Sequence, residues 1–152
     1  MFESYDQDIG MLSNEINKKL IHYVNCKLEK FKLTTEQWLV LMKLSKQNRI
    51  SQKQLAEISG KDQSTLTRII DILERKKFIE RHPSKEDRRS FLIHITDEGL
   101  ITCKKVTPFL EEIFKGVLKG ISYEKVKIFR EVFLQIDENI DNLHNTGGVT
   151  LK

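Results

Sequence analysis

Residues 62–99, DQSTLTRIIDILERKKFIERHPSKEDRRSFLIHITDEG, decide the fold of this 152-residue chain. In the first half, apolar residues recur every three or four positions, which predicts a helix that begins at about Asp62 and buries one face. In the second half, segments 78–82 and 91–95 alternate apolar and polar residues, which predicts two strands joined by residues 83–90. The apolar positions of the helix are Leu66, Ile69, Ile70 and Leu73.

A second, shorter helix is expected immediately upstream. Ser51 and Gln54 have the spacing of a capping box, in which the serine side chain accepts a backbone N–H and the glutamine reaches back to the cap. Gly60 then permits a left-handed turn between the two helices. Two short helices joined by a turn and followed by a charged hairpin form a winged helix-turn-helix. The sequence therefore predicts a mainly α fold of that class, with residues 34–96 as the winged helix.

The exposed face of the 62–75 helix carries the side chains that read DNA base edges. Glutamine suits adenine, arginine suits guanine, and serine or threonine suit either base. An isolated helix with these residues is usually just a solvated face, so the assignment depends on the elements around it. The exposed positions are Gln63, Ser64, Thr67, Arg68, Asp71 and Arg75.

The tip of the hairpin concentrates charge in KEDRRS, residues 85–90. A wing lies beside the DNA groove that the recognition helix occupies, so Lys85, Arg88 and Arg89 are expected to meet phosphates or a narrow minor groove. Asp87 lies two residues before Arg89, and we expect its carboxylate to hydrogen-bond the guanidinium and orient it. The alternative is an ordinary solvated turn.

The distribution of charge supports a polyanion-binding centre. The whole chain has a net charge of +4, but residues 43–93 hold 13 Lys and Arg against 7 Asp and Glu. The rest of the chain therefore has a slight negative balance. A basic segment between near-neutral flanks is typical of a DNA-binding module on a scaffold.

Helical periodicity also continues on both sides of this module. Ser122 is expected to cap the last helix, and Pro108 is expected to bend the helix before it. The apolar face of the flanks exceeds what one chain needs for its own core, which indicates a homodimer. Residues 1–33 and 97–145 are the predicted dimerisation region, and residues 146–152 a flexible tail. The C-terminal seam is Val126, Phe129, Phe133, Ile136, Ile140 and Leu143.

Together, the STLTRIIDILE helix, the IER strand, the DRRS wing and the following IT-DEG resemble the winged-helix core of the MarR (multiple antibiotic resistance regulator) family. The resemblance implies a homodimeric transcriptional repressor that binds palindromic double-stranded DNA operators. It also implies release by a small aromatic or acidic ligand, or by cysteine oxidation. Asp87 and Arg89 match the wing's aspartate and groove-inserting arginine, while Lys77 stands where relatives commonly have glycine. The predicted DNA-contacting set is Gln63, Ser64, Thr65, Thr67, Arg68, Arg75, Lys85, Asp87, Arg88 and Arg89.

Other classes of protein fit the sequence less well. The four histidines are scattered along the chain, and no metal-ligand spacing or glycine-rich phosphate loop occurs, so we expect neither an enzyme nor a bound cofactor or metal. No signal peptide and no membrane span are expected, which predicts a cytoplasmic protein. Cys26 and Cys103 are expected to be small buried residues, with redox sensing as the alternative. A winged helix that serves only protein–protein contact is the remaining rival.

Overall fold

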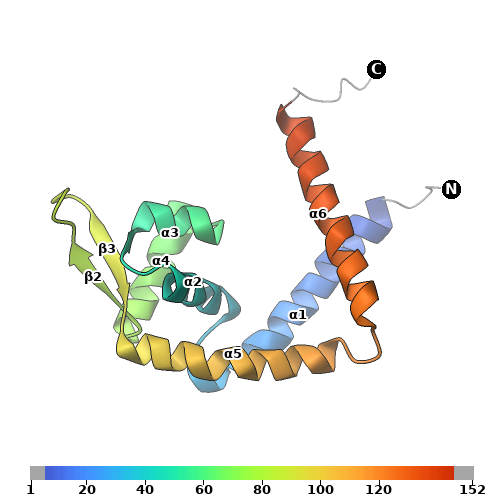
Figure 1. Cartoon of the computed structure of the whole chain (residues 1–152), viewed down its shortest axis with the longest axis horizontal. Helices are drawn as coiled ribbons and strands as arrows, with labels where there is room; N and C mark the ends of the chain where they lie inside the picture. Colours follow the sequence, from blue (N-terminus) through green and yellow to red (C-terminus); the bar gives the residue numbers. More distant parts are fainter. Residues whose placement is uncertain (1–5, 146–152) are drawn as a thin grey trace. The chain divides into compact units, whose positions relative to one another are not determined.

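The computed structural model describes residues 6–145, and the predicted tail at residues 146–152 lies outside them. The chain divides into a unit that ends at Leu110 and a unit that begins at Glu111. Helices predominate, with a small sheet in the first unit (Figure 1). In chain order the elements are η1 (Asp6–Met11), α1 (Leu12–Leu28), η2 (Glu29–Phe31), α2 (Thr35–Lys46), β1 (Ile50–Ser51), α3 (Gln52–Ser59), α4 (Gln63–Arg75), β2 (Ile79–Pro83), β3 (Phe91–Ile95), α5 (Asp97–Val117) and α6 (Tyr123–Asn145).

Side-chain caps fix where the helices of the winged helix begin. The predicted capping box of α3 is confirmed: Ser51 Oγ accepts the Gln54 backbone N–H at 3.2 Å, and Gln54 Oε1 accepts the Ser51 N–H at 3.0 Å. Gly60 ends α3 in the left-handed conformation, with φ +61°. Asp62 then caps α4 through the Thr65 N–H, so α3 and α4 form the expected helix-turn-helix.

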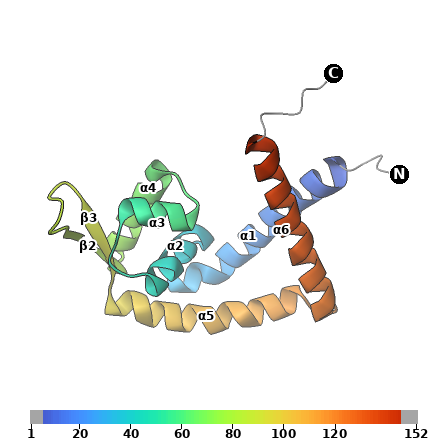
Figure 2. The same cartoon turned by 45° about the horizontal axis from the view of Figure 1, so that its top comes forward.

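The sheet has three antiparallel strands in the order β1-β3-β2. The hairpin of β2 and β3 confirms the two predicted strands, with Ile79 opposite Ile95 and His82 opposite Leu92. Strand β1 was not predicted, because two residues are too few to show alternation; it pairs Ile50 with Ile93. In both views the β2–β3 hairpin projects beyond α3 and α4 (Figures 1 and 2).

The core of the first unit lies where α2, α3 and α4 pack on one face of the sheet. All four predicted apolar positions of α4 are buried, and Leu41, Leu44, Leu55 and Ile93 are fully enclosed with them. Burying a leucine or isoleucine side chain stabilises the fold by about 1.5–3 kcal/mol. The helix-turn-helix is therefore held rigidly against the hairpin, and the orientation of α4 is set by the core.

The junction between α4 and the sheet requires an unusual backbone at Lys77. The Phe78 N–H donates to the Leu73 carbonyl at 3.0 Å and the Lys77 N–H to the Glu74 carbonyl at 2.9 Å, the two bonds of a Schellman cap. This cap needs a left-handed residue, and Lys77 adopts φ +63°. The predicted departure from glycine is thus accommodated by a lysine in the left-handed conformation, at a cost of about 1 kcal/mol.

Gly99 is required where α5 leaves the sheet. A Cβ added there would lie 2.3 Å from the Phe78 carbonyl oxygen and 2.8 Å from Ile95 Cγ1. The same corner is closed by Thr96, whose hydroxyl donates to the Lys77 carbonyl at 2.7 Å and accepts the Gly99 N–H at 3.1 Å. The glycine of the DEG sequence, Gly99, is therefore needed because any side chain at this position would clash with Phe78 and Ile95.

Helix α6 presents an apolar face that its own unit does not cover. Ser122 caps the helix by accepting the Lys125 N–H at 3.3 Å, as predicted. None of its residues is buried: Phe129 is 61% exposed and Phe133 40% exposed. The rings of Phe129 and Phe133 contact each other, with centroids 4.5 Å apart. No helix among the described residues is both long and apolar enough to cross a bilayer.

Candidate nucleic-acid interface

The exposed face of α4 begins with a firmly capped N-terminal turn. Asp62 Oδ1 accepts the Thr65 N–H at 2.8 Å and Oδ2 accepts the Thr65 hydroxyl at 2.8 Å. Both bonds stabilise the ionised carboxylate and lower the pKa of Asp62, and the bond from the Thr65 backbone has the larger effect. Gln63 and Ser64 follow directly and are exposed, so their side chains lie at the rigid N-terminal end of the helix.

Two of the predicted contact residues are already engaged within the protein. Thr67 Oγ1 donates to the Gln63 carbonyl at 2.7 Å and accepts from Gln52 Nε2 at 2.6 Å, which ties α4 to α3. The Thr65 hydroxyl is held by Asp62, as described above. Both threonines are half-buried, whereas Arg68 and Arg75 are exposed. The hydroxyl protons of Thr65 and Thr67 are therefore used within the protein, which leaves their methyl groups and remaining lone pairs for a ligand.

The wing tip is built as a hydrogen-bonded turn around Asp87. The Asp87 carbonyl accepts the Ser90 N–H at 3.1 Å and the Ser90 hydroxyl at 3.2 Å. The Ser84 hydroxyl accepts the N–H groups of Glu86 and Asp87, at 3.3 and 3.4 Å. One backbone bond, from the Ser84 N–H to the Ser90 carbonyl at 3.0 Å, closes the base of the turn. The five charged residues of the tip, residues 85–89, thus stand on a turn whose backbone is held by hydrogen bonds.

The expected bond from Asp87 to the Arg89 guanidinium is absent in the described structure. Asp87 Oδ1 instead accepts the Arg89 backbone N–H at 2.9 Å. A carboxylate two residues upstream reaches the backbone more easily than the end of a long arginine side chain, the geometry of an Asx turn. Asp87 therefore fixes the backbone direction at Arg89 and leaves the guanidinium available.

Arg81 joins the wing to the recognition helix, a role that was not predicted. Its guanidinium donates to Asp71 and to Glu74, which lie three residues apart on α4. Burial opposes the charge of Arg81, but these two carboxylates more than offset it and raise the pKa of the guanidinium. The helical spacing of Asp71 and Glu74 was visible in the sequence; their distance from Arg81 depends on how the strand packs.

The cations of this surface differ in whether a partner neutralises them. Among residues 6–145, no carboxylate pairs with Arg68, Lys85, Arg88 or Arg89. Arg75 uses its Nε to donate to the Asp71 carbonyl at 3.3 Å and keeps its charge exposed. Unneutralised arginines on a helix face and a neighbouring turn suit an anionic polymer.

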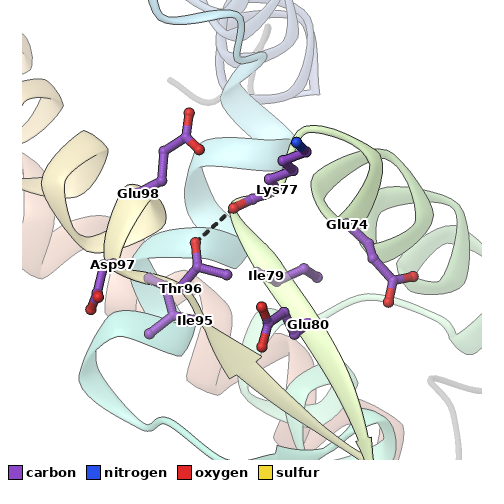
Figure 3. A pocket seen from close by; sticks show the side chains of 8 residues that line it. All are labelled: Glu74, Lys77, Ile79, Glu80, Ile95, Thr96, Asp97 and Glu98. Atoms are coloured by element: carbon purple, nitrogen blue, oxygen red, sulfur yellow. Dashed lines mark hydrogen bonds between the residues drawn. The ribbon is translucent and has the colours of Figure 1, made fainter.

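A hollow at the junction of α4 with the sheet has the opposite character. It occupies about 700 Å³ beside the end of α4, and Figure 3 shows its carboxylates around Lys77 and Thr96. Carboxylates repel phosphate, so this side of the winged helix does not suit DNA. The four acids are Glu74, Glu80, Asp97 and Glu98.

The comparison with protein families decides the type of winged helix. Residues 33–91 match the model of the MarR family, which covers the segment from just before α2 to the start of β3. This segment is therefore similar to the winged helix of the MarR family. The resemblance carried by the recognition helix and the wing is thereby confirmed.

Solved structures extend the match from the MarR-type segment to the fold of most of the chain. A cysteine-to-serine mutant of MarR from E. coli, complexed with operator DNA, aligns with a TM-score of 0.81 at 23% identity, covering 90% of this chain and 97% of that one. The S. aureus MepR–DNA complex aligns with a TM-score of 0.75 at 22% identity, covering 87% of this chain and 96% of that one. A probable transcriptional regulator from Pseudomonas aeruginosa aligns with a TM-score of 0.79 at 20% identity, covering 87% of this chain and 98% of that one. At these identities the likeness establishes the MarR-type fold.

The cysteines occupy contrasting environments. Cys26 is exposed on α1, so the expectation that it is a buried packing residue is wrong; its Sγ lies 3.9 Å from His22 Nε2. Cys103 is buried, as expected, and burial raises the pKa of its thiol. Within the part of the chain that is described, no three His, Cys, Asp or Glu side chains are arranged to hold a metal ion.

Proposed function

We propose that this protein is a transcriptional regulator that binds specific sequences of double-stranded DNA. The observation that carries the proposal is the set of unneutralised cations on the exposed face of α4 and on the wing tip, Arg68, Lys85, Arg88 and Arg89. The core holds α4 at a fixed angle to the hairpin, so both elements can meet one duplex. The DNA complexes of E. coli MarR and S. aureus MepR, which have the same fold, support the proposal.

In this proposal α4 lies in the major groove. Gln63 and Ser64 at its N-terminal end, together with Arg68 one turn later, contact base edges, and Arg68 is suited to a bidentate bond with guanine. Arg75 lies two turns beyond Arg68 and contacts phosphate. On the wing, Lys85 and Arg88 contact phosphate, while Arg89 enters the minor groove from a backbone that Asp87 holds in place.

We further propose that two copies act together as a homodimer. The support is the exposed apolar seam of α6, together with Leu12, Ile16 and other exposed apolar residues of α1. A monomer seldom leaves so much apolar side chain in water. Residues 1–33 and 97–145 form the dimerisation region in this proposal, and residues 34–96 the DNA-binding domain. A two-fold dimer would recognise a palindrome with half-sites about 34–36 Å apart.

Regulation would act through the distance between the two recognition helices. We propose a repressor that a small aromatic or acidic molecule releases from DNA by moving those helices away from one DNA turn. Oxidation is the second candidate signal, because Cys26 is exposed and lies near a histidine. Loss of a peroxide response in Cys26→Ser, with the response kept in Cys103→Ser, would select oxidation over the ligand.

Selection of bound sequences from a random pool of duplexes tests the function itself. The proposal expects a palindromic consensus, and titrations of that duplex by fluorescence anisotropy at several salt concentrations should show strong salt dependence. Repeating the selection with candidate effectors identifies the ligand. Recovery of no sequence, together with salt-independent or absent binding, would leave a winged helix used for protein–protein contact.

A further inference from the structure

The outer face of the hairpin carries a pair of histidines whose association was not expected. His82 on β2 and His94 on β3 were predicted to be scattered, but their rings stack with centroids 4.0 Å apart and an interplanar angle of 9°. The register explains the contact: His82 is opposite Leu92, so His94 is its diagonal neighbour on the same face. This face points away from the core side chains Ile79, Ile93 and Ile95.

The histidines border a hollow of about 590 Å³, which we call the outer wing hollow. Two cations from different segments line it. Arg49 comes from the turn before β1, where its N–H donates to the Ile93 carbonyl at 3.1 Å and to Asn48 Oδ1 at 2.9 Å. Lys85 comes from the first part of the wing turn. The polar lining is Arg49, His82, Ser84, Lys85, Glu86 and His94.

The backbone holds Arg49 in place at a conformational cost. Its φ is +60°, a conformation that L side chains rarely adopt. Strain of this kind persists only where the surrounding bonds fix it, and it often accompanies a binding site. The guanidinium is not paired with any carboxylate among the described residues. Arg49 is also close enough to His94 to lower the pKa of that histidine, after the larger effects of burial and of His82.

Two carboxylates, Glu80 and Glu86, also face this region and contribute negative charge to it. Glu80 lies beside the stack and its Oε2 is 2.9 Å from His82 Nε2, so it is already matched to that ring. Glu86 lines the outer wing hollow and opposes the cations. With both imidazoles neutral, the two cations and the two acids balance. Each proton taken up by the stack then adds one positive charge.

We propose that the outer wing hollow binds a tetrahedral oxyanion, the phosphate or sulfate group of a small ligand or a phosphate of a DNA backbone, and binds it more tightly when the histidine pair is protonated. Arg49 supplies a guanidinium fork that fits two oxygens of such a group, and Lys85 supplies a point charge. The imidazole N–H groups supply further donors. The site lies outside the base-reading face of α4 and does not depend on it.

Linkage fixes the direction of the pH effect. Two charged rings 4.0 Å apart repel each other, so the stack without an anion resists carrying two positive charges. A bound anion stabilises positive charge on both rings and offsets this repulsion. Anion binding is therefore coupled to proton uptake by the stack, and the affinity for the anion should rise as the pH falls.

Sulfate is the appropriate first probe, because its charge does not change between pH 5.5 and 8 and any pH dependence then belongs to the protein. We expect NMR titration of the full-length protein to shift the ring signals of His82 and His94, with sulfate binding about tenfold tighter at pH 5.5 than at pH 8. Arg49→Asn removes the charge but tolerates the left-handed backbone, and should weaken binding about tenfold. Glu86→Gln should tighten binding, and Lys53→Ala, which removes an exposed cation of α3, should leave it within twofold.

Several results would overturn the proposal. These are equal sulfate affinity at the two pH values, an Arg49→Asn protein that binds as well as the wild type, or signals that shift only at the wing tip. Competition separates the two sources of the anion: a duplex that displaces sulfate assigns the site to a backbone phosphate, and a duplex that binds without displacing it assigns the site to a small phosphorylated or sulfated ligand. A protein that binds sulfate here but no duplex at all would sustain this proposal while refuting the proposed function.

Discussion

Replacing Arg81 with methionine tests whether the wing and the recognition helix are coupled through one side chain. Methionine keeps the length and the apolar packing of the arginine stem but loses the guanidinium that bonds Asp71 and Glu74. The Arg81 side chain is 20% exposed, while its partners are 52% and 40% exposed. Because both acids are then left in water, the large penalty for an unpaired buried charge does not arise.

The expected loss follows from that exposure. Two partly solvated ion pairs contribute about 0.5–1 kcal/mol each, so Arg81→Met should lower the free energy of unfolding by about 1–2 kcal/mol in urea titrations. The double variant Asp71→Asn, Glu74→Gln should cost at least as much, because it leaves the 20% exposed Arg81 side chain without its carboxylate partners; adding Arg81→Met to it should cost little more. Full additivity of the two changes, or an unchanged unfolding midpoint in Arg81→Met, would refute the coupling. DNA affinity should also fall, because the wing loses the ion pairs that reinforce its packing against α4.

Three other substitutions test particular parts of the structure. Lys77→Gly should stabilise the protein by about 0.5–1 kcal/mol in the same urea titration, because glycine adopts the left-handed conformation without strain; a loss of stability would contradict the account of the Schellman cap. Gly99→Ala should cost about 2 kcal/mol or more, because its Cβ meets the Phe78 carbonyl at 2.3 Å; a melting temperature equal to that of the wild type would show that the corner can relax. Phe133→Asp should place a charge in the dimer seam and give a monomer by sedimentation, with Lys127→Asp as an exposed control on the same helix; a monomeric wild type at micromolar concentration would disprove the dimer.

The winged helix was predictable because its determinants are local. Capping at Ser51, the left-handed turn at Gly60 and the apolar spacing on α4 each involve residues within one or two helical turns. The two hairpin strands follow from alternation over five residues each. Strand β1 escaped prediction because its pairing with β3 joins residues more than 40 positions apart and leaves no local pattern.

The site was less predictable, because its geometry depends on packing between elements. Asp87 and Arg89 were correctly linked, but the donor is the Arg89 backbone and not its side chain. In the sequence Arg81 is simply one polar residue of a strand, and its ion pairs with Asp71 and Glu74 could not be predicted without knowing that β2 packs beside α4. The stacking of His82 on His94 could have been found from the hairpin register, since positions on the same face of paired strands follow from the turn length.

The most direct test of DNA recognition compares Arg68→Ala with Arg89→Ala on the duplex obtained by selection. Anisotropy titrations at four or more salt concentrations give both the affinity and its salt slope. DNA recognition by α4 and the wing predicts that Arg68→Ala loses about 1–3 kcal/mol mainly on the selected sequence, and that Arg89→Ala lowers the salt slope by about one unit. If both variants bind the selected duplex with the affinity and salt slope of the wild type, neither α4 nor the wing contacts DNA as proposed.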